Sequence, residues 1–213
     1  LRSGRNRTGR RGCNHPMKAK IAVLVSGGGT NLQALLDAEK SGILHSGQIV
    51  LVVSSRPDAY ALTRARAAGV EALTVARSEG ETKLIEALDA RAIDLVVLAG
   101  YLTILSADFV KRFENRIVNV HPSLIPAFCG AGFYGLKPHE AALARGCKVT
   151  GATVHLVNEI PDGGHILAQK AVEILPGDTP ETLQKRVMVE AEWVLLPRAV
   201  EDLCAQITKE KRV

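Results

Sequence analysis

The sequence predicts an α/β protein with a three-layer, mostly parallel twisted sheet of about seven strands and helices on both faces. Two observations predict it. Short runs rich in Val, Ile and Leu alternate along the 213-residue chain with helix-like stretches, the pattern of a doubly wound sheet. Runs such as 21–26 and 94–99 are apolar without alternation, which is typical of strands buried on both faces of a parallel sheet.

Each predicted element has a local signal. The β-branched and apolar runs predict strands over 21–26, 49–54, 71–75, 94–99, 117–120, 150–155 and 166–172. Helical periodicity predicts helices over 31–38, 59–68, 82–91, 106–112 and 139–145, and a last helix from about residue 180 towards 207. Thr179 is the expected N-cap of the last helix, and Pro197 is expected to kink or split it.

The composition indicates one globular domain over residues 17–213. The chain is 46% hydrophobic but only 4% aromatic, so its core must be aliphatic. Its four cysteines show no C-x-x-C spacing, which favours reduced thiols and a cytoplasmic location. No apolar run reaches the roughly 20 residues that a membrane helix needs, so no membrane partner is expected.

Residues 1–16 differ from the rest of the chain. They hold five arginines and no acidic residue, and these arginines account for the whole formal net charge of +5. Such a segment could be a nucleic-acid arm or a transit peptide. We expect instead a disordered basic tail of upstream or cloning-derived sequence, because Met17 looks like a natural start, and we predict no nucleic-acid partner.

A glycine turn follows the first predicted strand. Gly28, Gly29, Thr30 and Asn31 lie between that strand and a helix, an arrangement that presents free N–H groups to an anion. The turn lacks the Gly-Lys-Ser/Thr ending of a P-loop and the third glycine of the dinucleotide fingerprint, so a single phosphate fits best. A bulky residue at Gly29 is expected to fill the phosphate's space. The alternative is a tight turn with an ordinary helix cap.

The run 117–126 ends a strand with chemically useful residues. Asn119 and His121 are two apart, so both side chains leave the same face of an extended strand. Pro122 ends the strand, and the carboxyl ends of such strands are where open α/β sheets hold ligands. An amide and an imidazole there could donate hydrogen bonds to developing oxygen charge. Alternatively, the amide caps a turn and the imidazole is held by a backbone carbonyl.

Three segments together resemble the folate-dependent formyltransferases. They are Ser26-Gly-Gly-Gly-Thr-Asn-Leu32, Asn119-Val-His-Pro-Ser-Leu-Ile-Pro126 and Asp162-Gly-Gly164. The resemblance covers residues 17–213 and is greatest to members that act on glycinamide ribonucleotide in purine (IMP) biosynthesis. It implies a formyltransferase fold and transfer of the formyl group of 10-formyltetrahydrofolate to the amine of 5′-phosphoribosylglycinamide. It implies small-molecule substrates, no metal, and a monomer or homodimer.

The resemblance also implies roles for individual residues. The implied catalytic residues, which would stabilise an oxyanion and move a proton, are Asn119, His121 and Asp162. The implied acceptor contacts are Gly28, Gly29, Thr30, Asn31 and Glu192. The implied folate contacts are Arg77, Leu102, Thr103, Ile104, Leu105 and Asn119, with the backbone of 157–162. Two departures stand out: Thr103 occupies a usually basic position, and the spacing from Arg186 to Glu192 is one residue longer than in the family.

Two other functions compete with this one. A formyltetrahydrofolate hydrolase would use the same trio with water as acceptor, but such proteins usually carry an N-terminal regulatory domain, for which residues 1–16 are too few. A non-catalytic nucleotide-binding module would keep the fold without the activity, and the intact trio argues against it. Of the other histidines, His155 is expected to pack or to orient the site, whereas His139 and His45 are expected at the surface.

Overall fold

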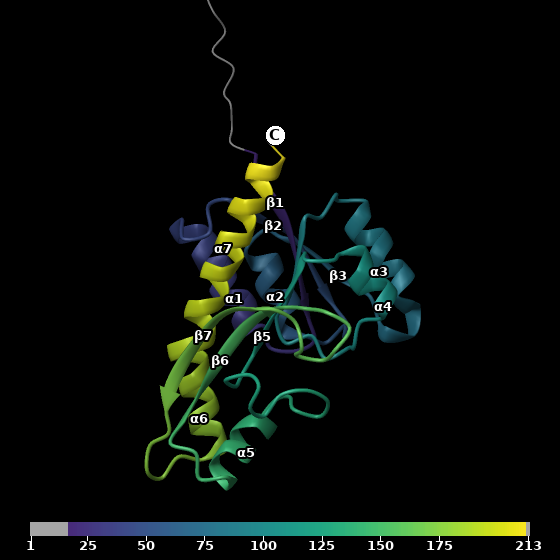
Figure 1. Ribbon diagram of the computed structural model, residues 1–213. Helices are drawn as coiled ribbons and strands as arrows, with labels where there is room; N and C mark the ends of the chain where they lie inside the picture. Colours follow the sequence, from purple (N-terminus) through teal and green to yellow (C-terminus); the bar gives the residue numbers. More distant parts are fainter. Residues whose placement is uncertain (1–16, 212–213) are drawn as a thin grey trace, which may run out of the picture.

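The computed structural model describes residues 17–211. A seven-stranded sheet with the order β3-β2-β1-β4-β5-β6-β7 runs through the molecule (Figure 1). The strands from β1 to β5 pair in parallel, and β6 and β7 are added antiparallel at one edge. The predicted mostly parallel sheet is therefore confirmed, whereas the predicted tail, 1–16, lies outside the described residues.

The elements lie within a few residues of their predicted bounds. The strands are β1 Ala19–Val25, β2 Gly47–Ser54, β3 Glu71–Thr74, β4 Leu95–Leu98, β5 Ile117–His121, β6 Val149–Leu156 and β7 Ile166–Glu173. The helical segments are α1 Thr30–Ser41, α2 Tyr60–Ala67, η1 Arg77–Glu79, α3 Gly80–Asp89, α4 Ala107–Arg112, α5 Lys137–Ala144, α6 Pro180–Val187, η2 Met188–Glu192 and α7 Trp193–Glu210.

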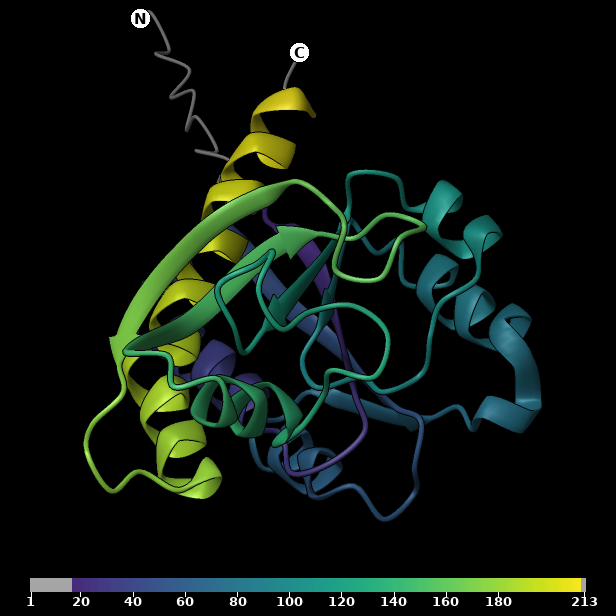
Figure 2. The same cartoon turned by 60° about the horizontal axis from the view of Figure 1, so that its bottom comes forward.

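Two apolar clusters, one on each face of the sheet, form the core. Because successive strand residues point to opposite faces, β1 divides its side chains between the two. Val23 packs in the cluster that also contains residues of α1, α2 and α7. Leu24 packs in the cluster that contains residues of α3 and α4. Figures 1 and 2 show the helices on both sides of the sheet, which confirms the three layers.

The antiparallel edge is built from a long ribbon of two strands. β6 pairs with β7 over most of its length, and α5 and α6 lie near the far end of this ribbon (Figure 2). The pairing of β6 with β5 places His155 opposite Asn119 and Thr153 opposite His121. The sheet register therefore brings a second polar strand beside the end of β5.

The last helix is broken at a different place from the one predicted. α7 continues through Pro197, and the irregular turn is the π-helical segment η2, which precedes it. A π turn takes in an extra residue without ending the helix, and this one lies in the stretch from Arg186 to Glu192. The hydrogen bond that Pro197 removes is the one to the carbonyl of Trp193, the first residue of α7. Thr179 caps α6 as predicted.

No helix within residues 17–211 has the length and hydrophobicity needed to cross a lipid bilayer.

Candidate active site

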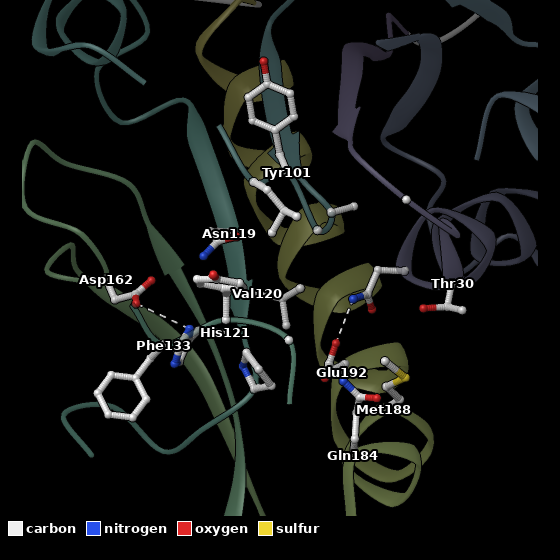
Figure 3. Close-up of a pocket in the computed structure, with 18 of the residues that line it drawn as sticks. Thr30, Tyr101, Asn119, Val120, His121, Phe133, Asp162, Gln184, Met188 and Glu192 are labelled. Carbon is white, nitrogen blue, oxygen red and sulfur yellow. Dashed lines mark hydrogen bonds and ion pairs between the residues drawn. The ribbon is translucent and has the colours of Figure 1, made fainter. Parts of the chain in front are cut away.

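A cavity of about 770 Å³ lies at the carboxyl ends of β1, β4 and β5. The chain order of the strands reverses between β1 and β4, and open α/β sheets bind ligands at such switch points. Figure 3 shows Asn119, His121 and Asp162 on one side of the cavity and Thr30 and Glu192 on the other. The structure thus brings the predicted catalytic and acceptor-binding residues around one space.

The side chain of Asn119 is oriented by His155. The Nδ2 atom of Asn119 lies 3.2 Å from Nε2 of His155, and Nδ1 of His155 lies 2.8 Å from the carbonyl oxygen of Leu156. Because a carbonyl only accepts hydrogen bonds, Nδ1 of His155 donates to Leu156, and Nε2 is left facing both the amide of Asn119 and, at 3.5 Å, Oδ1 of Asp162. The buried His155 therefore fixes the amide of Asn119 at the edge of the cavity, in agreement with an orienting role.

His121 lies between a carbonyl and a carboxylate. Its Nε2 atom lies 2.9 Å from the carbonyl oxygen of Phe128, and its Nδ1 atom lies 3.4 Å from Oδ2 of Asp162. The carbonyl requires a proton on Nε2, so Nδ1 is the position at which this ring gains or loses a proton. Nδ1 faces the carboxylate that can share that proton (Figure 3).

Asp162 is held as a carboxylate by its surroundings. Burial alone would raise the pKa of Asp162, but the contact with His155, the hydrogen bond from the N–H of Gly130 and the positive charge of His121 together lower that pKa. The hydrogen bond from Gly130 to Oδ2 is 2.8 Å long. The backbone of Asp162 is left-handed, with φ of 56°, a conformation that costs free energy outside glycine and is common at functional sites.

Gly164 is required by a close backbone contact. A Cβ atom at this position would lie 1.7 Å from the carbonyl oxygen of Leu156, so no side chain fits there. The Asp162-Gly-Gly164 motif thus allows the loop after β6 to return against the end of that strand. This return places Asp162 beside His121.

The loop after β5 is fixed by buried hydroxyl groups. Thr153 donates a 2.7 Å hydrogen bond to the carbonyl of Ser123 and accepts one of 3.1 Å from the N–H of Ile125. Both hydroxyl-bearing residues are fully buried. The chain that leaves His121 is therefore anchored to β6, which keeps the imidazole in place.

The glycine turn leaves its N–H groups free. α1 begins after Gly29, which has φ of 74° and offers no side-chain cap, and its first turn holds no acidic residue. The first backbone hydrogen bond of the helix runs from Gln33 to the carbonyl of Gly29. Among residues 17–211, no backbone or side-chain acceptor bonds the N–H groups of 28–31. These donors and the helix dipole suit an anion.

A bulky residue at Gly29 was expected to fill the phosphate's space, but the structure gives a different reason why it would be harmful. A Cβ atom there would lie 2.6 Å from Cβ of Ala61 in α2, and the positive φ would strain it. Such a variant would therefore damage the packing of the turn. Gly28 has no positive φ, and a Cβ atom there would meet nothing within 4 Å. Gly28 lines the cavity, so a side chain at this position is the one that would occupy ligand space.

Glu192 and Asn31 form a buried pair on the wall opposite His121. Nδ2 of Asn31 donates a 2.7 Å hydrogen bond to Glu192, whose side chain is 4% exposed. Burial raises the pKa of Glu192, and the hydrogen bond from Asn31 opposes the shift only in part. Oδ1 of Asn31 is buried and has no partner among the described residues. An acceptor oxygen therefore remains available to a ligand that enters the cavity.

Two further residues on this wall were not predicted. Gln184 and Met188 line the cavity with Glu192, at intervals of four residues along α6 and η2 (Figure 3). The wider π turn keeps the third side chain on the same face as the first two. The four-residue spacing of these side chains could have been noticed in the sequence. The π turn that keeps all three on one face of the helix could not have been predicted from it.

The predicted folate contacts divide into two groups. Leu102 and Ile104 line the cavity and are 63% and 80% exposed, so an apolar ligand could cover them. The cavity lining does not include Thr103, Leu105 or Arg77. Leu105 packs towards the core under β4, and Arg77 is exposed in η1. Contacts from these three side chains stay predictions without support from this geometry.

Aromatic side chains that the sequence analysis did not predict also line the cavity. They are Tyr101, Phe133 and Tyr134.

The surface location predicted for His139 is wrong. Its side chain is 0% exposed, because α5 turns its Pro138, His139 and Ala142 face inward. Burial and the nearby charge of His121 lower the pKa of His139 to about 4, so its ring is neutral near pH 7.

His45 is at the surface as predicted, 3.1 Å from Glu201. Residues 17–211 contain no group of His, Cys, Asp and Glu that could hold a metal.

The sequence of nearly the whole chain is similar to known proteins. Residues 19–200 match the family described as formyl transferase. A protein named chloroplastic phosphoribosylglycinamide formyltransferase, from Arabidopsis thaliana, is 39% identical over 93% of this chain and 70% of its own length. The phosphoribosylglycinamide formyltransferase of Haemophilus influenzae is 40% identical over 85% of each chain. The human trifunctional purine biosynthetic protein adenosine-3 is 40% identical, and the match spans only 18% of its length.

Solved structures give the same result for the fold. Glycinamide ribonucleotide transformylase 1 from Symbiobacterium toebii superimposes with a TM-score of 0.82 at 42% identity over 89% of both chains. A formyltetrahydrofolate deformylase from Pseudomonas putida superimposes with a TM-score of 0.76 at 30% identity, over 87% of this chain and 65% of that one.

Proposed function

The chain belongs to the formyl transferase family, and from this premise we propose that it transfers the formyl group of 10-formyltetrahydrofolate to the amine of 5′-phosphoribosylglycinamide. Relatives named for this activity support the proposal. The product would be a formylated intermediate of purine synthesis. The cytoplasmic location stays a prediction, since two plant relatives carry names that place them in the chloroplast.

The reaction requires an oxyanion to be stabilised and a proton to be moved. The acceptor amine attacks the formyl carbon, the carbonyl electron pair moves to oxygen, and the bond from carbon to the folate nitrogen then breaks. Asn119, oriented by His155, would donate a hydrogen bond to the negative oxygen. His121 and Asp162, 3.4 Å apart, would take the proton from the attacking amine and return it to the leaving nitrogen.

One observation favours an acceptor that bears a phosphate over water as the acceptor. The cavity that holds His121 and Asp162 also contains the uncapped N-terminus of α1, with Gly28 and Asn31 in its lining. A hydrolase whose acceptor is water has no need of an anion site there. The similarity to a deformylase leaves the hydrolase as the second candidate.

Inhibition by inorganic phosphate tests this proposal. We expect phosphate to compete with glycinamide ribonucleotide in initial-rate assays, because both would occupy the turn at 28–31. Phosphate should not compete with the formyl folate, which would lie against Leu102 and Ile104. Competition with the folate alone would place the anion site elsewhere and contradict the proposal.

A side chain at Gly28 should exclude the acceptor. For Gly28→Val we expect the acceptor KM to rise at least about tenfold, because the added methyl groups would enter open cavity space. The folate KM and the melting temperature should stay near wild type, since the new Cβ would meet no atom within 4 Å beyond its two neighbours in the chain. Gly28→Ala should give a smaller effect in the same direction. An unchanged acceptor KM in Gly28→Val would rule out phosphate binding at this turn.

The buried carboxyl group of Glu192 predicts a pH-dependent stability difference. Because the pKa of Glu192 is raised by folding, its proton stabilises the protein at low pH, and this contribution is lost as pH rises through the folded-state pKa. Glu192→Gln keeps an acceptor for Asn31 and carries no charge. We therefore expect Glu192→Gln to melt higher than wild type at pH 8, by about 2–4 °C for each 1 kcal/mol, and nearly equally at pH 5. Thermal unfolding measured at both pH values checks this, and a lower melting temperature at pH 8 would contradict it.

A further inference from the structure

We propose that Arg64 is a positioning residue for the anion site: its guanidinium group holds the glycine turn open for the acceptor's phosphate and supplies a fixed positive charge beside it. This inference rests on the proposed function. Arg64 lies on α2, outside every motif that the sequence analysis singled out, and it does not line the cavity. Arg64 would therefore act on the bound phosphate through the backbone of the turn and would not touch the ligand.

Arg64 joins the turn to the helix that follows it. Its Nε atom donates a 2.8 Å hydrogen bond to the carbonyl of Gly28, and its Nη1 atom donates one of 3.0 Å to Oε1 of Gln33 in α1. The guanidinium group also lies 5.0 Å from the centre of the Tyr60 ring. Contacts on three sides fix the fork of an arginine in one orientation, which a lysine could not reproduce.

These contacts keep backbone donors available. In an uninterrupted helix, the carbonyls of Gly27 and Gly28 would accept from the N–H groups of Asn31 and Leu32. Instead, the carbonyl of Gly27 accepts from the N–H of Ala61, at 3.1 Å, and that of Gly28 accepts from Arg64. Both replacement donors belong to α2. The first turn of α1 therefore starts late and leaves its N–H groups to a ligand.

The charge of Arg64 adds to this effect. A guanidinium group stays protonated at any pH that the protein tolerates. The first turn of α1 contains no acidic side chain. The buried Glu192 accepts a hydrogen bond from Asn31 of this turn, and burial raises its pKa, which favours its uncharged form beside the anion site. The unpartnered Oδ1 of Asn31, in a side chain that is 8% exposed, independently indicates that a ligand completes this corner of the cavity.

Four variants separate positioning from general stability. Arg64→Met removes the charge and both hydrogen bonds, and Arg64→Lys keeps the charge. Gln33→Leu leaves Arg64 in place but removes its bond to Nη1, together with an exposed hydrogen bond from Gln33 to Asp37. Arg66→Met is the matched control, because Arg66 is on the same helix, is exposed, and its side chain makes no hydrogen bond or ion pair among the described residues. The measurements are the KM of each substrate, the inhibition constant of inorganic phosphate, and the melting temperature.

For Arg64→Met we expect the acceptor KM and the phosphate inhibition constant to rise together by about tenfold or more, with the folate KM unchanged. Arg64→Lys and Gln33→Leu should give smaller increases in both, and Arg66→Met none. If Arg64→Met does not fold, the Lys and Leu variants decide: wild-type values in both would overturn the inference. So would equal values for Arg64→Met and Arg66→Met. Failure of the wild-type protein to use the acceptor would instead refute the proposed function.

Discussion

Asp162→Asn is expected to lower turnover by at least about a hundredfold while leaving the fold and the binding of both substrates near wild type. An amide oxygen can still accept the hydrogen bond from the N–H of Gly130 and can keep the left-handed backbone at this position. An amide cannot take a proton from His121, which is 3.4 Å away in the native site. The loss should therefore fall on kcat and spare KM.

Two further variants complete this test. Asp202→Asn makes the same chemical change on the exposed face of α7 and should behave as wild type. His121→Ala should cost about as much turnover as Asp162→Asn. The double variant should cost far less than the product of the two losses, because residues that act as one unit are not additive. Normal turnover in a folded Asp162→Asn protein would remove the carboxylate from the mechanism.

Glycinamide without its ribose phosphate is expected to be a very poor acceptor, in rate as well as in affinity. If the turn at 28–31 binds the phosphate, much of the acceptor's binding free energy comes from a group remote from the amine. Remote binding of this kind can orient the amine against the formyl carbon, so its loss lowers kcat as well as raising KM. We expect kcat/KM to fall by at least about a hundredfold, the scale of positioning effects.

Measuring both acceptors with Gly28→Val tests whether the contribution of the phosphate arises at the turn 28–31. The variant should lose activity with glycinamide ribonucleotide, yet its residual rate with free glycinamide should match that of wild type, because the short acceptor does not reach the turn. A comparable kcat/KM for both acceptors in the wild-type protein would show that the phosphate contributes nothing to the reaction.

The sequence was sufficient where structure is decided locally. The apolar runs, the glycine turn and the strand that ends at His121 carry their own signals, and parallel strands necessarily bring their carboxyl ends to one edge. The position of Asn119 and His121 at that edge follows from period-two alternation. These rules placed Asn119, His121 and the glycine turn at one edge of the sheet before any tertiary contact was known, whereas Asp162 was implied only by the resemblance to the formyltransferases.

The sequence was insufficient where a residue's role depends on what another element brings against it. His139 lies at the start of a short helix that reads as exposed, and only the packing of that helix against the rest of the fold buries it, which lowers its pKa and keeps it neutral near pH 7. Glu192 shares the cavity wall with Gln184 because a π turn lies between them. Arg64 contacts the glycine turn across a sequence distance that no local pattern reports.

The fate of the formyl carbon is the most direct test of the transferase function. Formyl-labelled 10-formyltetrahydrofolate would be incubated with the protein, with and without glycinamide ribonucleotide, and the label in formate and in formylated ribonucleotide would be measured. We predict that the label reaches the ribonucleotide in one-to-one proportion to the tetrahydrofolate formed, and that almost none is released without the acceptor. Release of labelled formate at the full rate, independent of the ribonucleotide, would contradict the transferase function and identify a hydrolase.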